Sequence, residues 1–247
     1  LKECWPVVLQ RAVDSISVGD ISSGPIMLVL LPGLDGTDVF FRPLLAVLPE
    51  RITPLVVQFP SSTANGYQDL LGLTRHALVA VQRCYVLGWS FSGPLALMLA
   101  AAEPEKVRGV ILASSFVRPP RRLFALLRWA SVTPLIWLFR AIKRVPVWLS
   151  RTSNDRLLRD KAETWKRVSA KMIAARIRTL LAVDARPLLR TCPCPVLCVA
   201  GQDDQVVPHH NVEEMAHVRA SLHVRTIAGG HFAIYTNPSE IAAAIEP

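Results

Sequence analysis

The sequence lacks an apolar run long enough to cross a membrane. The longest charge-free apolar run in the middle of the chain, residues 129–139, has 11 residues, whereas a membrane-spanning helix needs about 20. The first residues, LKECWPVVLQR, also lack the long apolar core and the small-residue cleavage site of a secretory signal peptide. We therefore expect neither a transmembrane helix nor a signal peptide in these residues.

Signals for cofactors and metals are also missing. The sequence has no P-loop, no dinucleotide-binding fingerprint and no cluster of metal ligands. Its five cysteines are Cys4, Cys84, Cys192, Cys194 and Cys198. Cys192 and Cys194 are too close in the chain for an unstrained disulfide, and the CxxC spacing of metal and redox sites is absent. We therefore expect free thiols in a reducing compartment, a cytoplasmic location, and no cofactor or metal.

What the sequence does contain is an alternation of strands and helices. Hydrophobic residues make up 51% of the 247 residues, which suits a well-buried core in one large domain or one domain with an insertion. Apolar runs bounded by turn signals predict strands at residues 26–31, 52–59, 84–88, 107–113, 195–200 and 222–228. Helices are predicted at residues 42–48, 67–82, 91–102, 209–218 and 239–245, and residues 5–18 are predicted to add one or two antiparallel edge strands. This alternation predicts an α/β fold with a doubly wound, mostly parallel sheet.

The alternation stops between residues 117 and 190. This segment contains stretches compatible with helix, interrupted by prolines, and no convincing strand. We predict a core formed by residues 1–116 and 191–247, with residues 117–190 inserted as a helical cap over one end of the sheet.

The basic charge of the protein is concentrated in this insertion. Residues 117–190 hold 18 lysines and arginines against four acidic residues, a net charge of +14, whereas the rest of the chain has a net charge of −5. No nucleic-acid recognition fold accompanies the charge, so we do not expect a nucleic-acid partner. An acidic acyl carrier protein, an anionic substrate or an anionic membrane surface fits such a segment better. A plain cap with solvated arginines is the alternative.

The stretch LGWSFSGP, residues 87–94, places Ser90 between two glycines at a junction of elements. A short apolar strand precedes the serine and a strongly apolar helix follows it. So sharp a turn needs small residues on both sides, and it exposes the serine hydroxyl in front of a helix N-terminus. These are the conditions that a nucleophilic serine requires.

Here the chain resembles the α/β-hydrolase family, whose nucleophile elbow reads G-x-S-x-G. Gly88 and Ser90 fit this pattern, but Ser92 stands at the final glycine and Gly93 follows it. Serine is small enough to pack there. The stretches LGWS at the elbow and LASS at residues 112–115 are similar to the esterase that cleaves the methyl ester of a pimeloyl carrier protein.

The family resemblance also implies where the partners of the serine lie. The loop Gly201-Gln202-Asp203-Asp204-Gln205-Val206-Val207-Pro208 is similar to the family's acid loop and places the acid at Asp204, with Asp203 as a neighbour that could be mistaken for it. After the strand at residues 222–228, Gly229-Gly230-His231-Phe232 is similar to the family's histidine turn. The other five histidines are expected at the surface.

The resemblance also implies an oxyanion hole formed by two backbone N–H groups. One belongs to Phe91, which follows the serine, and the other to Leu34, in the loop after the first strand. Pro32 stands in that loop where family members usually have histidine. Trp89, Phe116 and Phe232 lie beside the predicted catalytic loops and would make an apolar, aromatic cleft suited to an acyl chain, although core packing is the alternative for each.

These residues predict a serine hydrolase that cleaves the ester or thioester of an apolar, small-molecule acyl substrate through Ser90, His231 and Asp204. An alternative is a hydrolase or acyltransferase acting on acyl groups presented by an acidic carrier protein or an anionic membrane surface. The remaining alternative is a non-catalytic binding protein on the same fold. Its usual mark is the loss of a triad residue, and none is lost here.

Overall fold

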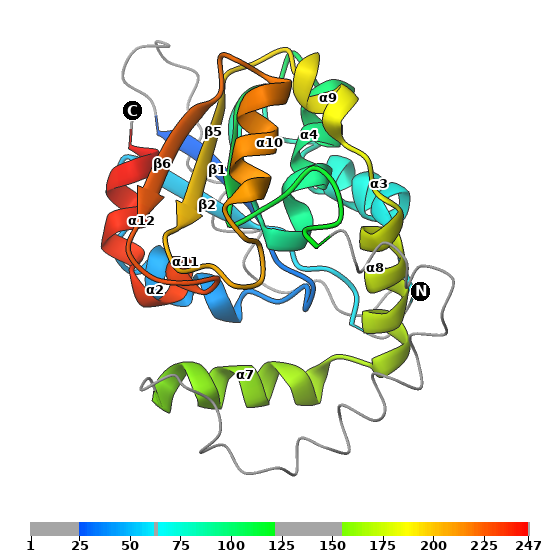
Figure 1. The fold of residues 1–247 in the computed structure, drawn as a ribbon, viewed down its shortest axis with the longest axis vertical. Helices are drawn as coiled ribbons and strands as arrows, with labels where there is room; N and C mark the ends of the chain where they lie inside the picture. The colour runs from blue at the N-terminus through cyan, green and yellow to red at the C-terminus, as the bar shows by residue number, and fades with distance from the viewer. Residues whose placement is uncertain (1–24, 62–63, 122–154, 247) are drawn as a thin grey trace.

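The computed structural model describes residues 25–61, 64–121 and 155–246 of the chain. These residues form one parallel sheet with the strand order β2-β1-β3-β4-β5-β6 (Figure 1). The strands are β1 (Ile26–Leu31), β2 (Ile52–Val56), β3 (Cys84–Trp89), β4 (Val107–Ala113), β5 (Val196–Gly201) and β6 (His223–Ile227). Because β1 lies between β2 and β3, the direction of winding reverses at β1. Loops after β1 and β3 therefore meet at a topological switch point, where open α/β sheets bind their ligands.

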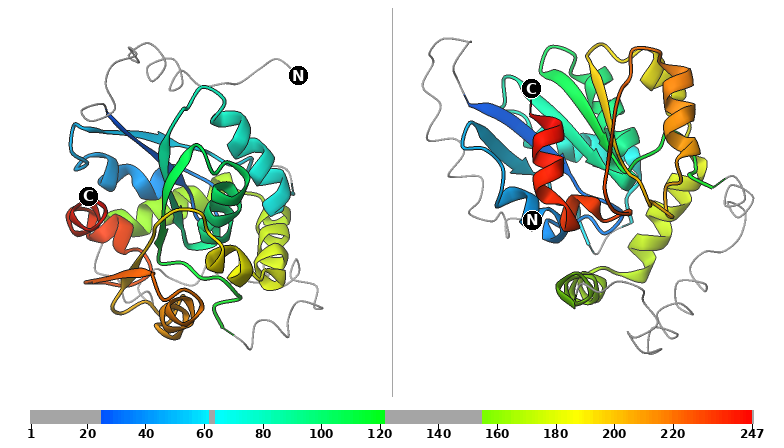
Figure 2. Two further views of the ribbon diagram at one scale, coloured as in Figure 1. Left: turned by 90° about the horizontal axis from the view of Figure 1, so that it is seen from above. Right: turned by 60° about the vertical axis from the view of Figure 1, so that its left-hand side comes forward.

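Helices cover both faces of the sheet, as Figure 2 shows. They are η1 (Val39–Phe41), α2 (Arg42–Leu45), α3 (Tyr67–Ala77), η2 (Ser90–Ser92), α4 (Gly93–Ala102), α7 (Asp155–Arg167), α8 (Ala170–Ala182), α9 (Arg186–Arg190), α10 (His210–Val218), α11 (Ala233–Thr236) and α12 (Pro238–Ile245). Side chains of α3, α4, α9 and α10 pack into the core on one face. Side chains of η1, α2, α11 and α12 pack into the core on the other face.

The apolar strands follow from this double covering. In β1, Val29 and Leu31 pack into one core, while Leu28 and Leu30 pack into the other. A strand buried on both faces needs apolar side chains in both directions, which explains why IMLVLL shows no alternation of polar and apolar residues. The predicted α/β fold and its doubly wound parallel sheet are therefore confirmed.

Three elements end three or more residues earlier than the sequence predicts, and one of them is α2, which ends at Leu45 instead of residue 48. β2 ends at Val56, because the following residues turn towards the loop after β1, where the Phe59 N–H donates to the Gly36 carbonyl at 2.9 Å. α3 ends at Ala77, where the N–H of Leu78 reaches several carbonyls of the last turn at once. The predicted edge strands at residues 5–18 lie outside the described residues.

Two described helices of the predicted insertion lie apart from the sheet. Figure 1 shows α7 crossing beyond the carboxyl ends of the strands, and α8 leading from α7 back towards α3. α9 instead packs against α4 and α10, and the Ala185 N–H donates to the Val117 carbonyl at 2.7 Å. The chain therefore leaves and re-enters the body at adjacent points. Residues 122–154, the centre of the predicted cap, lie outside the described residues, and the predicted domain boundaries stay a prediction.

The four cysteines in the described part of the chain are free thiols. The Sγ atoms of Cys192 and Cys194 lie 3.7 Å apart. Burial raises the pKa of Cys84 to about 11 and that of Cys198 to about 12. Within the described residues, no helix combines the length and the apolar character that a membrane span requires.

Candidate active site

Ser90 lies in a sharp turn between β3 and α4. Its φ of 51° falls in the left-handed region, which residues other than glycine seldom adopt. The turn leaves no room for side chains at its flanks: a Cβ added at Gly88 would lie 2.4 Å from the Ser92 carbonyl oxygen, and one at Gly93 would lie 1.9 Å from Ser115 Oγ. Both glycines are therefore required by close packing. The Ser115 hydroxyl donates to the Ser90 carbonyl at 2.6 Å and fixes the turn from β4.

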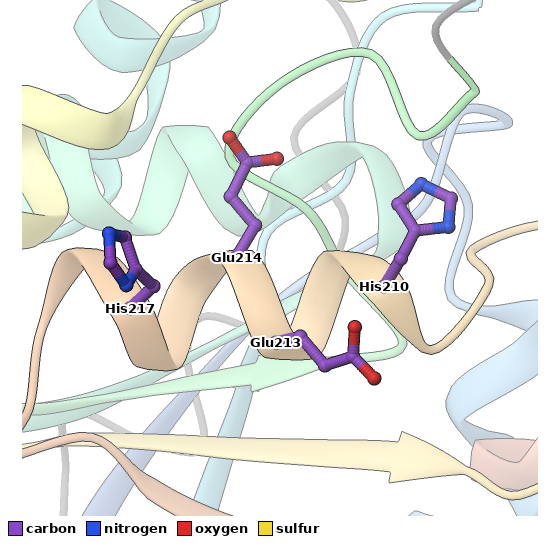
Figure 3. A pocket seen from close by; sticks show the side chains of 4 residues that line it. All are labelled: His210, Glu213, Glu214 and His217. Atoms are coloured by element: carbon purple, nitrogen blue, oxygen red, sulfur yellow. The ribbon is translucent and has the colours of Figure 1, made fainter.

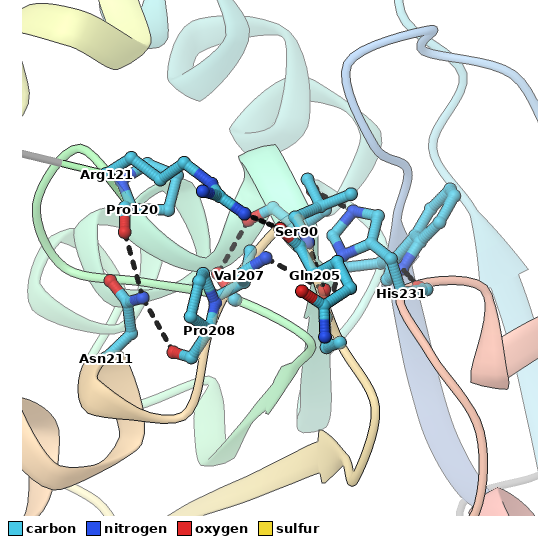
Figure 4. Close-up of polar contacts among 12 residues, drawn as sticks. Ser90, Pro120, Arg121, Gln205, Val207, Pro208, Asn211 and His231 are labelled. Atoms are coloured by element: carbon cyan, nitrogen blue, oxygen red, sulfur yellow. Dashed lines mark hydrogen bonds and ion pairs between the residues drawn. The ribbon is translucent and has the colours of Figure 1, made fainter. Parts of the chain in front are cut away.

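A continuous chain of hydrogen bonds joins Ser90, His231 and Asp204. The Nε2 atom of His231 lies 2.9 Å from Ser90 Oγ, and its Nδ1 atom lies 2.9 Å from Asp204 Oδ2. Figure 4 shows the imidazole of His231 beside Ser90, at the ends of strands that are far apart in sequence. In this arrangement the imidazole can accept the hydroxyl proton while the carboxylate holds it in the required tautomer.

Asp204 is fixed by its own loop. Its Oδ1 atom accepts the backbone N–H groups of Val206 at 2.9 Å and Val207 at 2.8 Å, and the residue is 6% exposed. Asp203 has an exposed side chain. Of the two neighbouring aspartates, Asp204 is therefore the one that contacts His231, as the register of the loop predicts.

The loops that carry Asp204 and His231 pack directly on each other. A Cβ added at Gly201 would lie 2.7 Å from the carbonyl oxygens of Gly229 and Gly230, and the φ of Gly229 is +96°. The indole Nε1 of Trp89 donates to the His231 carbonyl at 3.3 Å. The close packing at Gly201 and the hydrogen bond from Trp89 thus place the His231 imidazole in front of the serine turn.

The loop after β1 is attached to the same turn. Ser92 Oγ donates to the Pro32 carbonyl, and the Tyr67 hydroxyl donates to the Phe91 carbonyl at 2.7 Å. Ser92, which stands where the family pattern has glycine, therefore joins the serine turn to the loop that carries Leu34. The structure brings Leu34 and Phe91, the two predicted N–H donors, to the switch point of the sheet.

Two of the predicted cleft residues are buried in the cores instead. Trp89 is 3% exposed and packs against Phe40 with ring centroids 5.4 Å apart, and Phe116 is 1% exposed in the opposite core. Both side chains belong to the cores, which corrects the prediction that they line a substrate cleft. Phe232 is half-buried, and its ring packs on Trp89 with centroids 5.5 Å apart.

Helix α7 contacts this part of the site through residues that the sequence analysis did not single out. The Tyr235 hydroxyl donates to Asp160 Oδ2 at 2.6 Å, and the Lys161 ammonium lies 3.8 Å from the centroid of the Phe232 ring. Leu157 packs into the same core as Trp89. The insertion is therefore attached to α11, directly after the loop that carries His231.

The start of the insertion is attached to the acid loop. Arg121 donates to the Gln205 carbonyl, and the Asn211 side-chain amide donates to the carbonyls of Pro120 at 3.1 Å and Pro208 at 2.8 Å (Figure 4). The insertion thus contacts the site near its start and again through α7.

A separate hollow lies on α10, which contributes no residue to the hydrogen-bonded chain. Its lining is His210, Glu213, Glu214 and His217 (Figure 3). Glu214 forms an ion pair with Arg118 at 2.7 Å, and no group of three or more histidine, cysteine or acidic side chains in the described residues could hold a metal. The histidines predicted to lie at the surface are exposed in the structure, namely His76, His209, His210, His217 and His223. The hollow is therefore a surface feature of α10.

The sequence is similar to a known protein family and to several characterised or named proteins. The model of the alpha/beta hydrolase family matches residues 28–244. A putative carbamate hydrolase RutD of Stutzerimonas stutzeri is 26% identical, with 76% of this chain and 78% of that protein covered. The magnesium-chelatase 30 kDa subunit of Rhodobacter capsulatus is 27% identical, with 92% and 90% covered.

Solved structures share the fold. A structure from work on carboxylesterases of Nitrososphaera gargenis has a TM-score of 0.73 at 20% identity, with 92% of this chain and 89% of that chain covered. The enol-lactonase of Burkholderia xenovorans LB400 has a TM-score of 0.70 at 16% identity, with 92% of each chain covered. With the family model spanning nearly the whole sequence, the chain belongs to the alpha/beta hydrolase family.

Proposed function

We propose that the chain is a serine hydrolase that cleaves a carboxylic ester or thioester through an acyl-enzyme on Ser90. The observation that carries this proposal is the hydrogen-bonded chain Ser90–His231–Asp204, with both contacts of the imidazole at 2.9 Å. Its acid is held in place by two backbone N–H groups. The turn has a strained backbone at Ser90 and leaves no space beside its two glycines. It therefore keeps the serine hydroxyl in front of the N-terminal end of α4.

In the first half of the reaction, Ser90 Oγ attacks the carbonyl carbon while His231 Nε2 accepts the hydroxyl proton. Asp204 stabilises the imidazolium that forms. The negative charge on the carbonyl oxygen is stabilised by the backbone N–H groups of Leu34 and Phe91, each worth about 3 kcal/mol in the transition state. The C–O or C–S bond then breaks, and the leaving group takes its proton from His231.

In the second half, water attacks the acyl-enzyme. His231 accepts a proton from the water, the second tetrahedral intermediate collapses, and the proton returns to Ser90 Oγ. The product acid leaves, and the hydrogen-bonded chain is restored. An acceptor other than water would make the same step an acyl transfer.

An apolar acyl group is the substrate that the surroundings favour. Leu34 lies on the loop of the proposed oxyanion donor and Phe232 follows His231, and both side chains are half-buried. Apolar pockets with few polar groups suit acyl chains. The names of similar proteins, a putative carbamate hydrolase and an enol-lactonase, indicate related carbonyl chemistry. Carbamates and lactones therefore belong in the same substrate screen.

A second candidate is an acyl group presented by an acidic carrier protein or an anionic membrane surface. The observation that favours it is α7, which contacts the site through Tyr235 and has exposed Arg156, Arg159 and Lys166 side chains. Exposed basic side chains beside the site would raise the encounter rate with an acidic partner.

The proposal is tested by a screen of p-nitrophenyl and CoA esters of increasing chain length, with Ser90→Ala as the control. We expect turnover that rises with acyl chain length over the short chains and falls by about 10⁴-fold or more in the variant. Equal turnover by the wild type and Ser90→Ala would contradict the proposal. A folded wild type without turnover on any ester, thioester, carbamate or lactone would favour a binding protein.

A further inference from the structure

Arg176 is a fully buried arginine that comes from the insertion. It lies on α8, on the same buried face as Met172 and Ile173. Taking a guanidinium out of water is costly unless its N–H groups find partners. The hydrogen-bond acceptors of the guanidinium therefore indicate the role of Arg176.

The guanidinium donates three hydrogen bonds, and all three acceptors are uncharged oxygens. Nη1 donates to the Leu34 carbonyl, Nη2 to the Pro60 carbonyl and Nε to Asn65 Oδ1, each at 2.9 Å. Leu34 follows β1, whereas Pro60 and Asn65 follow β2. A single side chain of the insertion thus holds the loop after β1 to the loop after β2.

The loop after β1 is shaped to admit this guanidinium. A Cβ added at Gly36 would lie 2.5 Å from Arg176 Nη1, and the φ of Gly36 is +77°. The Phe59 ring lies 5.3 Å from the guanidinium carbon. Burial lowers the pKa of Arg176 to about 10, and the charge of Asp35 opposes this shift. The side chain therefore stays protonated at neutral pH.

We propose that Arg176 is a positioning residue for the oxyanion hole, an inference that rests on the proposed function. The loop after β1 has two anchors on either side of the Leu34 N–H. Ser92 Oγ holds the Pro32 carbonyl from the serine turn, and Arg176 holds the Leu34 carbonyl from α8. The Gly33 carbonyl, which shares its peptide group with the Leu34 N–H, accepts the Gly36 N–H at 3.0 Å. With the peptide groups on both sides anchored as well, these contacts fix the direction of the N–H donor.

The arrangement also couples the insertion to the chemistry. An oxyanion donor stabilises the transition state only when it points at the position of the developing charge. Because Arg176 belongs to α8, the packing of the insertion sets the direction of the Leu34 N–H. Arg176 itself does not touch the substrate in this account.

The test compares Arg176→Lys and Arg176→Met with Arg178→Met, which removes an exposed arginine from the same helix. Titration with a fluorophosphonate gives the concentration of active sites, so that kcat is measured per folded molecule. The second readout is the inhibition constant of a trifluoromethyl ketone carrying the acyl chain of the best ester. Its hemiketal oxyanion occupies the oxyanion hole, whereas the ester ground state does not depend on the hole to the same degree.

We expect both Arg176 variants to lower kcat per site by about 10²-fold, the loss typical of one oxyanion donor, with KM changed by less than about 3-fold. The inhibition constant should rise by a similar factor as kcat falls, and Arg178→Met should match the wild type. If Arg176→Met does not fold, Arg176→Lys carries the test.

Two results would overturn the inference while leaving the proposed function intact. One is a kcat per site and an inhibition constant within about 3-fold of wild type in the variants. The other is a raised KM at unchanged kcat. A wild-type protein that neither hydrolyses esters nor reacts with the fluorophosphonate would overturn the proposed function, and the inference with it.

Discussion

Asp204 uses its two carboxylate oxygens for different purposes. Oδ1 accepts two backbone N–H groups of its own loop, and Oδ2 faces His231 Nδ1. The backbone contacts leave the carboxylate one orientation, and that orientation presents Oδ2 to the imidazole. The tautomer of His231 that carries its proton on Nδ1 is then favoured, and Nε2 is left to accept the proton of Ser90.

The first prediction therefore concerns two neighbouring aspartates. Asp204→Asn should lower kcat by about 10⁴-fold, because an amide in place of the carboxylate favours the wrong tautomer of His231. Asp203→Asn should change kcat little, because its side chain is exposed. Both are measured by the initial rate of ester hydrolysis. The reverse ranking would show that Asp203 orients the histidine.

At the scale of the element, the serine turn depends on the close approach of β3, α4 and β4. Gly93 begins α4, and the space that its Cβ would occupy is taken by the Ser115 hydroxyl. That hydroxyl donates to the Ser90 carbonyl. A methyl group at this position therefore disturbs both the packing and the contact that fixes the strained serine.

The second prediction compares two glycine-to-alanine changes. Gly93→Ala should lower the free energy of unfolding by about 1–3 kcal/mol, the range for overpacked cores, and should slow ester hydrolysis. Gly72 lies at an exposed position inside α3, and no heavy atom lies within 4 Å of the added Cβ. Gly72→Ala should therefore raise the free energy of unfolding by roughly 0.5–1 kcal/mol. Urea unfolding of both variants measures these changes. Equal stability of the two variants would contradict the close packing at Gly93.

The sequence predicts those features whose signal lies in neighbouring residues of the chain. The strands are apolar runs, and Ser90, Asp204 and His231 each follow a strand in the order that the family resemblance implies, so their positions were predictable. Trp89 and Phe116 were misplaced because an aromatic beside a catalytic loop fits core and cleft equally well. Arg176 was missed because its acceptor oxygens lie 111 to 142 residues away in the chain. Its one local signal is an arginine at helical spacing from Met172 and Ile173.

At the scale of the whole molecule, the insertion carries most of the positive charge and also contacts the site. α7 presents exposed Arg156, Arg159 and Lys166, and it is attached beside His231 through Asp160 and Tyr235. A partner that binds this helix would bring its acyl group close to Ser90. Charges at such a surface act mainly on the encounter rate and are screened over about 8–10 Å at physiological salt.

The third prediction separates docking from simple solubility. Reversal of Arg156, Arg159 and Lys166 together to glutamate should lower kcat/KM for an acyl group on an acidic carrier protein, as should rising salt. A small neutral ester reaches Ser90 without docking, so its kcat/KM should be nearly unchanged by either treatment. If both substrates respond alike, the charge of α7 serves solubility or stability, and docking is wrong.

The central claim is that Ser90 is the nucleophile, and active-site labelling tests it most directly. A fluorophosphonate should add once per chain, and peptide mapping by mass spectrometry should place the adduct on Ser90. Replacing His231 by alanine should slow the labelling strongly, because the hydroxyl then lacks its base. An adduct on the neighbouring Ser92, or labelling at an unchanged rate without His231, would contradict the account.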